Sequence, residues 1–243
     1  MYELFPVPGL LGAKQMSAPA LAIGSHAAYA DGNAYGYFAP YVSVPSVTWT
    51  ANDIVIAILV AVGDNPSVTP PASATWSNPA GWTQIGSTFQ PSSLNNGPYV
   101  GVFWKKNPSI YDTLSCSSIS SSDAAYCDAA VMVIQNANSI EALNTTTGSF
   151  TGTSGTMTAT SGSLSAGSTL VYANAPGKSA GLATVTIPSG MTGNASGPGG
   201  FSSGALIAAQ LAPGVGVQTK SSTSSGNQNL THGWATFMFG VTQ

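Results

Sequence analysis

The stretch from Asn52 to Asp64, NDIVIAILVAVGD, decides the fold. Its centre is an unbroken apolar run from Ile54 to Val62, and turn-type residues stand at both ends. A membrane-spanning helix needs roughly 20 apolar residues, so this run is too short to cross a bilayer. The β-branched residues, the length and the flanking turn residues favour a strand buried on both faces over a helix segment. We therefore predict a central core strand here.

The composition of the chain excludes several classes of protein. Only 5% of the 243 residues are charged, against about 25% in an average soluble domain. The basic residues are five lysines, which is too few for a patch that neutralises several phosphates, so we expect no nucleic-acid binding. The Ser, Thr, Asn and Gly that replace charge favour strands and turns over helices. Two interpretations of this surface stay open: one packed against other subunits, or that of a secreted or surface β protein.

Residues 1–20 predict an extended N-terminal arm, because Pro6, Pro8 and Pro19 break any helix. An apolar arm needs a surface to lie on, either that of its own domain or that of a neighbour, and in the second case it would anchor the protein. The alternative is an ordinary first strand followed by a loop. No secretory signal is evident, since Glu3 precedes every basic residue. We expect synthesis in the cytoplasm without classical export. The arm residues expected to make the anchoring contacts are Tyr2, Leu4, Phe5, Leu10 and Leu11.

The second part of the chain repeats the first weakly, at offsets of 105 to 115 residues. The paired segments are 53–57 with 168–172, 79–83 with 188–192, 100–108 with 205–213, and the strand that starts near 128 with the strand at 233–241. Drift of this size is what differences in loop length produce. A unit of about four strands, used twice, predicts eight strands in two sheets with jelly-roll-like connectivity.

The fold class we predict is therefore all-β: a two-sheet antiparallel β-sandwich, jelly-roll-like, with weak internal duplication and an extended N-terminal arm. Residues 21–243 form a single domain in this interpretation, with half-repeats at about 45–140 and 160–243. The Thr/Ser/Gly tract from Asn144 to Ser165 predicts exposed strand, because small residues alternate there with β-prone ones.

This order of motifs resembles a family of bacteriophage virion proteins that are often labelled minor tail proteins. The resemblance covers roughly residues 45–243 and implies a β-sandwich on the outside of a phage particle, with no catalytic residues. The arm lies outside the match. The matching residues are Asp53 to Val62; Pro79, Gly81, Trp82 and Thr83; Phe103, Trp104 and Lys105; Ala129 to Ile134; Pro188, Gly190, Met191 and Thr192; and Trp234 with Ala235.

Candidate catalytic and metal-binding residues are few. His26 and His232 are the only histidines, and neither lies in a nucleophile motif such as G-x-S-x-G. The eight acidic residues are scattered, and an Asp beside a strand, such as Asp53 or Asp64, is more often part of a turn than a calcium ligand. We therefore expect no enzymatic activity, no metal and no cofactor.

Aromatic side chains near one loop suggest a different role. Trp76, Tyr99 and Trp104 are candidate contacts for a cell-surface glycan or a protein partner, through stacking on sugar rings. For Trp82 we favour a structural role in which it plugs one end of the sandwich, because its counterpart in the repeat, Met191, is also large and apolar.

Cys116 and Cys127 flank a Ser-rich turn and could face each other across a hairpin. They are candidates either for a disulfide or for two buried thiols. Two cysteines cannot make a closed zinc site or a disulfide framework.

These observations predict a non-enzymatic structural component of a bacteriophage virion, with a minor tail protein as the first assignment. The alternatives are a capsid decoration or head-fibre protein, or a host-glycan-binding adhesin module. The expected partners are other virion proteins, either tail or capsid subunits. We also expect the chain to form a homo-oligomer, with a trimer as the expected state. We expect no membrane span.

Overall fold

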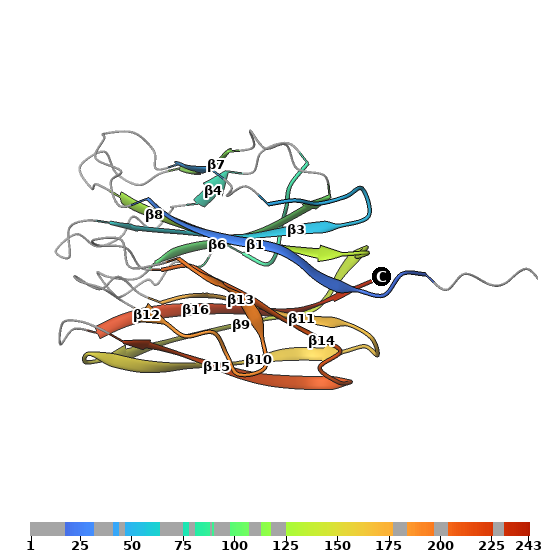
Figure 1. Ribbon diagram of the computed structural model, residues 1–243. Helices are drawn as coiled ribbons and strands as arrows, with labels where there is room; N and C mark the ends of the chain where they lie inside the picture. The colour runs from blue at the N-terminus through green and yellow to red at the C-terminus, as the bar shows by residue number, and fades with distance from the viewer. Residues whose placement is uncertain are drawn as a thin grey trace, which may run out of the picture.

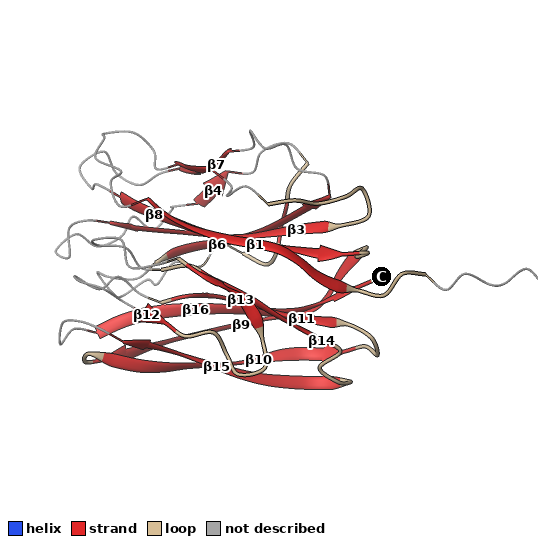
Figure 2. Ribbon diagram, in the orientation of Figure 1, coloured by secondary structure: helices blue, strands red, loops and turns tan. Residues whose placement is uncertain are grey.

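The computed structural model of the chain describes residues 18–31, 41–43, 47–63, 75–77, 81–87, 89, 98–106, 113–117, 125–176, 184–196, 204–225 and 231–243, and the description below refers to these residues. They form strands and connecting segments, with no helix (Figure 2). Accordingly, this part of the chain offers no candidate for a membrane-crossing helix.

Sixteen strands are present in the described residues, eight in each half of the chain. The first half contains β1 (Ala22–Asp31), β2 (Tyr41–Ser43), β3 (Ile54–Gly63), β4 (Thr75–Ser77), β5 (Thr83–Gln84), β6 (Tyr99–Lys106), β7 (Thr113–Ser117) and β8 (Ala125–Gln135). The second half contains β9 (Ser139–Thr151), β10 (Ser154–Leu164), β11 (Thr169–Ala175), β12 (Thr184–Val185), β13 (Thr192–Ala195), β14 (Leu206–Leu211), β15 (Gly216–Ser225) and β16 (Thr231–Thr242).

Four antiparallel sheets stack as layers (Figure 1). The first half forms an inner sheet in the order β1-β8-β3-β6-β5 and an outer sheet in the order β2-β7-β4. The second half forms an inner sheet in the order β13-β14-β11-β16-β9 and an outer sheet in the order β10-β15-β12. The two inner sheets pack face to face in the middle of the molecule, and the outer sheets cover them on either side (Figure 1).

Both halves have the strand pairing of a jelly roll. The first strand pairs with the last, the second with the seventh and the third with the sixth: β1 with β8, β2 with β7 and β3 with β6. The second half repeats this nesting as β9 with β16, β10 with β15 and β11 with β14. Each half is thus a jelly roll in its own right. The all-β antiparallel sandwich is confirmed, but it has four sheets where the sequence predicted two.

The register of the strands reproduces the sequence repeat. Thr83 in β5 lies opposite Trp104 in β6. Its counterpart in the repeat, Thr192 in β13, lies opposite Ala209 in β14. Trp104 and Ala209 are themselves counterparts in the sequence, so an alignment drawn from weak motifs coincides with the hydrogen-bonded pairing of the two halves.

The turn that precedes β5 and β13 is also shared. Gly81 and Gly190, the glycines of the two P-x-G motifs, have φ angles of +83° and +75°. This left-handed region strains every residue with a Cβ and suits glycine. In each half we call the apolar cluster on the other face of the inner sheet, away from the opposite half, the outer core. The residue after each glycine points into it: Trp82 is buried in the outer core of the first half, and Met191 packs against the outer core of the second. Trp82 is thus a buried core residue, as expected of a structural role, and that it plugs one end of the sandwich stays a prediction.

The strand predicted from residues 54–62 is β3, and its side chains alternate between two cores. Ile54, Ile56 and Ile58 face the inter-half core, which we define as the apolar layer between the two inner sheets. Val55, Ala57 and Leu59 face the outer core of the first half. All of these side chains are fully buried because β3 has a sheet partner on each side and an apolar layer on each face. The prediction of burial on both faces is confirmed.

The inter-half core joins the two jelly rolls into one apolar layer. It contains residues of β3, β6 and β8 from the first half and residues of β11, β14 and β16 from the second, Phe237 and Phe239 among them. Two polar links cross it: Asn194 of β13 donates to the carbonyl of His26 in β1 (3.1 Å), and Gly204 N–H donates to the buried carboxylate of Asp128 in β8 (2.9 Å).

The Ser/Thr-rich tract predicted to be exposed strand forms β9 and β10. Alternate side chains of β9 are exposed, and β10 alternates between exposed hydroxyls and buried residues such as Met157. The prediction for residues 144–165 is therefore confirmed, although the tract forms strands in two different sheets.

Candidate functional site: a polar pocket beside the C-terminus

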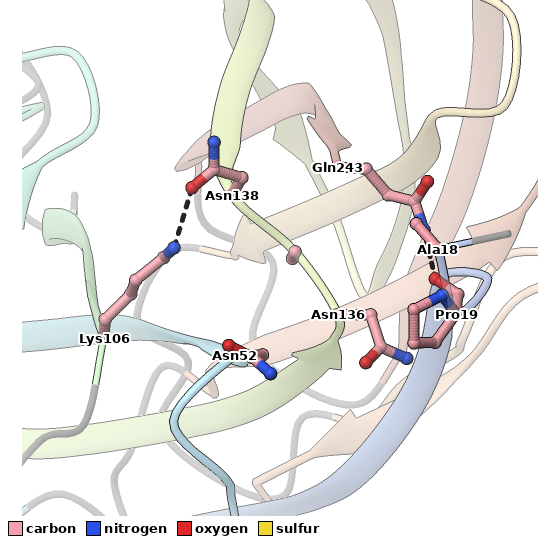
Figure 3. Close-up of a pocket in the computed structure, with 8 residues that line it drawn as sticks. Ala18, Pro19, Asn52, Lys106, Asn136, Asn138 and Gln243 are labelled. Carbon is pink, nitrogen blue, oxygen red and sulfur yellow. Dashed lines mark hydrogen bonds between the residues drawn. The ribbon is translucent and has the colours of Figure 1, made fainter. Parts of the chain in front are cut away.

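A pocket of about 200 Å³ lies at the end of the sandwich where the described chain begins and finishes (Figure 3). Its wall comes from segments far apart in sequence: the turn before β3, the end of β6, the link between β8 and β9, residues 18 and 19, and the C-terminal Gln243. The lining residues are Ala18, Pro19, Asn52, Lys106, Asn136, Ala137, Asn138 and Gln243.

Asn136 is held firmly at the exit of β8. Its φ angle is +58°, a conformation that asparagine tolerates better than most residues. Its backbone N–H donates to Asp53 Oδ1 (3.1 Å), and its side-chain amide donates to the carbonyl of Ala20 (2.9 Å). The other carboxylate oxygen of Asp53 accepts from Thr50 N–H (2.7 Å). Asp53 is therefore committed to two backbone groups, which fix the pocket wall.

Lys106 and Asn138 form the opposite wall. Lys106 Nζ donates to Asn138 Oδ1 (2.8 Å), and Asn138 N–H donates to the carbonyl of Thr242 (2.7 Å). Lys106 is exposed and is the only charged side chain among the eight lining residues. In Figure 3, Asn52 lies between Lys106 on one side and Asn136 on the other.

The pocket keeps hydrogen-bonding capacity that the described chain does not use. Asn52 makes no side-chain hydrogen bond within the described residues. Asn136 and Gln243 use their side-chain N–H groups on backbone carbonyls and retain their amide oxygens, whereas Asn138 uses its oxygen and retains its N–H groups. The lining therefore presents both donors and acceptors together with one cation. These groups are suited to hydrogen bonding with a polar ligand.

The aromatic residues predicted for glycan contact do not gather at this pocket. Tyr99 is only 2% exposed and packs in the outer core of the first half, so its ring offers no face to a sugar, and the prediction for Tyr99 is wrong. The sequence pattern misled here because strand alternation assigns the Tyr99 side chain to one face of its strand but does not show that a second sheet covers that face. Trp104 is partly exposed and packs against the inter-half core. Trp76 belongs to β4, and its side chain lies outside the described positions.

The two cysteines belong to strands that are not paired with each other. Cys116 of β7 lies opposite Trp76 of β4 in the outer sheet. Cys127 of β8 lies opposite Ala61 of β3 in the inner sheet. β7 and β8 therefore do not form the hairpin that was expected to bring the two cysteines together. Neither side chain is among the described positions, so the disulfide itself stays a prediction.

The remaining sequence candidates lie apart from the pocket or outside the described residues. The arm residues Tyr2, Leu4, Phe5, Leu10 and Leu11 fall in 1–17, beyond the described range. His26 faces the inner sheet of the second half, where its Nδ1 is buried without a hydrogen-bond partner in the described structure. Within the described ranges, no three His, Cys, Asp or Glu side chains group to hold a metal ion.

The asparagines of the pocket were not predicted as site residues. Their signal in the sequence is the tripeptide Asn136-Ala137-Asn138 directly after a core strand, a pattern typical of a tight turn. Turn chemistry alone does not reveal that Asn52, Lys106 and Gln243 converge on the same turn, because that requires the topology of both halves.

Comparisons with protein-family models, with curated proteins and with solved structures found no match to this chain. The resemblance to phage minor tail proteins therefore stays a prediction that rests on the motifs in the sequence.

Proposed function

We propose that this chain is a non-enzymatic structural component of a bacteriophage virion, displayed on the particle surface, with a minor tail protein as the leading assignment. The observation that carries the proposal is the repeated jelly roll with its inner sheets packed on each other. Jelly rolls are a recurrent architecture of viral capsid and lectin domains. The motif resemblance in the sequence points in the same direction.

The outer sheet of the second half supports this proposal through its surface. Exposed hydroxyl side chains on its strands, and on Thr186 directly after β12, bond to each other, as Thr158 does to Ser221 (2.8 Å) and Thr186 to Thr223 (2.8 Å). Packing charged side chains against a neighbour costs free energy for their desolvation, whereas hydroxyls that already bond to each other cost far less. Such a face suits contact with other virion proteins or with further copies of the chain, for which we propose a trimer.

The test is to locate the chain on particles of the phage that encodes it. Particles purified through a density gradient are labelled with gold-conjugated antibody raised against the chain, and their cryo-EM map is searched for the four-layer body. We expect label and density at the tail. Density at regular positions of the capsid lattice would replace the tail assignment with a decoration or head-fibre role. Particles that lack the chain in both measurements would refute the virion proposal.

A further inference from the structure

We propose that the polar pocket lined by Asn52, Lys106 and Asn138 binds a single sugar ring that carries a carboxylate, such as a uronic acid unit of a glycan. The inference rests on the pocket itself and does not depend on a virion role for the chain.

The size of the pocket limits the ligand. Pockets for drug-sized molecules usually measure roughly 300–1,000 Å³. The volume of about 200 Å³ found here is smaller and suits one ring. A polymer whose terminal unit enters the pocket would leave its other units in solvent.

The hydrogen-bonding groups indicate hydroxyls as the main partners. A hydroxyl both donates and accepts, so it matches a wall that carries both amide N–H groups and amide oxygens. Here the unused groups are the whole amide of Asn52, the N–H groups of Asn138 and the oxygens of Asn136 and Gln243. The apolar atoms of Pro19 and Ala137 offer a surface for the C–H groups of the ring.

The charge of the pocket indicates the carboxylate. Lys106 carries the only charged side chain among the lining residues, and its Nζ is oriented by Asn138. An ammonium group has three donors, and one of them is used here, which leaves the others for an anion. The nearby carboxylate of Asp53 accepts from Thr50 and Asn136 backbone N–H groups, so it is already occupied on both oxygens.

The frame that holds these groups is built from backbone contacts. The link between β8 and β9 is tied on one side to Asp53 and on the other to the carbonyl of Thr242. A pocket wall fixed in this way loses little conformational entropy when a ligand enters. With a single ring and no aromatic platform among the lining residues, the expected dissociation constant is on the order of millimolar.

The experiment is ligand-observed saturation-transfer NMR on the full chain with two probes that share a ring, methyl β-D-glucuronide and neutral methyl β-D-glucoside. We expect the glucuronide to bind roughly fivefold more tightly, the factor that an exposed ion pair supplies. The substitution Lys106→Gln should lower the affinity for the glucuronide to that for the glucoside and leave the glucoside unaffected. Asn52→Ala should weaken both.

A matched control removes a lysine elsewhere. Lys220 donates to the carbonyl of Ser189 and lies outside the pocket, so Lys220→Gln should change neither affinity. Circular dichroism and thermal unfolding of each variant establish that it is folded. Absence of saturation transfer to the glucuronide, equal affinity for both probes, or unchanged binding in Asn52→Ala and Lys106→Gln would each overturn the proposal.

Discussion

The carboxylate of Glu141 on β9 accepts two hydrogen bonds from Ser165, one from the backbone N–H (2.9 Å) and one from the hydroxyl (2.7 Å). Ser168, directly before β11, donates its hydroxyl to the same carboxylate. In the first half, Asp53 Oδ2 accepts from Thr50 N–H at the corresponding turn before β3. Each jelly roll thus uses a carboxylate to close the turn that enters its central strand, but Asp53 lies in the turn itself, whereas Glu141 belongs to β9.

Glu141 gives a pH-dependent contribution to stability. The hydroxyl of Ser168, followed by the backbone and hydroxyl of Ser165, lowers the pKa of Glu141 below its usual value, against the opposing effect of partial burial. Because the folded-state pKa is lowered, the stabilisation is full above the unfolded-state pKa and disappears as the pH falls through the folded-state pKa. We expect Glu141→Gln to lower the free energy of unfolding by about 1 kcal/mol at pH 7, since the site is partly exposed.

Urea unfolding of the wild type and of Glu141→Gln at a series of pH values checks this expectation. The difference between the two proteins should shrink towards acid pH. Thr147→Ala, at an exposed position of the same strand, serves as the control and should show no such trend. A difference between wild type and Glu141→Gln that stays constant from neutral pH down to strongly acid pH would contradict the role given to the carboxylate.

The close approach of β9 and β10 predicts a steric effect at Gly162. A Cβ at this position would lie 2.7 Å from the carbonyl oxygen of Ala142. Ala142 sits in a bulge of β9 with a φ angle of +53°, so its carbonyl has little freedom to move. We expect Gly162→Ala to destabilise the protein by about 2–3 kcal/mol, as overpacking of a close contact does.

A second glycine separates this steric effect from backbone strain. Gly167 has a φ angle of +79°, but no neighbouring atom lies within 4 Å of the position that a Cβ would take there. Gly167→Ala should therefore cost only the strain of the left-handed conformation, about 1 kcal/mol. Thermal and denaturant unfolding of the two variants give the comparison. An equal loss in both would show that crowding against Ala142 contributes nothing.

The hydroxyl of Tyr172 is the centre of a buried polar contact in the outer core of the second half. It donates to the carbonyl of Met157 (3.2 Å) and shares a hydrogen bond with Ser222 (2.9 Å). Burial raises the pKa of Tyr172, so the hydroxyl stays neutral while the protein is folded. Tyr172→Phe should cost about 1–2 kcal/mol, because it leaves the buried Ser222 hydroxyl without this partner.

A double-mutant cycle measures that contact. Ser222→Ala together with Tyr172→Phe removes both hydroxyls, and the double variant should be more stable than the sum of the two single losses predicts. Strict additivity in denaturant unfolding would mean that the two hydroxyls do not interact in solution.

The anchoring arm can be tested with a boundary that the structure supplies. The carbonyls of Pro19 and Ala20 accept hydrogen bonds from Gln243 and Asn136, so a truncation should remove residues 1–17 and keep residue 18 onward. We expect this variant to fold with an unchanged unfolding midpoint and to be missing from particles assembled in its presence. Incorporation at the wild-type level, measured by mass spectrometry of purified particles, would refute anchoring by the arm.

The sequence predicted the inner sheets better than the outer ones, for a physical reason. Strands such as β3 are buried on both faces and therefore appear as continuous apolar runs. The P-x-G turns before β5 and β13 need glycine at a positive φ, which makes them recognisable in both halves. These signals were sufficient to align the halves strand by strand.

The outer sheets carry weaker signals. β2 and β4 are three residues long, and β15 is largely Ser and Thr with one face in solvent. Such strands are stabilised by their position over an existing sheet, so their own residues say little about it. For the same reason Tyr99 was predicted at a surface that the outer sheet of the first half covers. The pocket could not be predicted from the sequence because its residues come together only when both jelly rolls have formed.

The packing of the inner sheets has a consequence for each jelly roll on its own. β1 contacts β13 through Asn194, while Gly86, just after β5, lies against Leu143 of β9. β1 and β9 are the first strands of the two halves, and β5 and β13 are the fifth. In both contacts the first strand of one half therefore meets the region of the fifth strand of the other, and such reciprocal contacts define an isologous interface. One chain thus contains what is, in geometry, a homodimer of jelly rolls joined by a three-residue link. A single half, released from the other, would expose the apolar face of its inner sheet, and we expect it to pair with its own copy through that face.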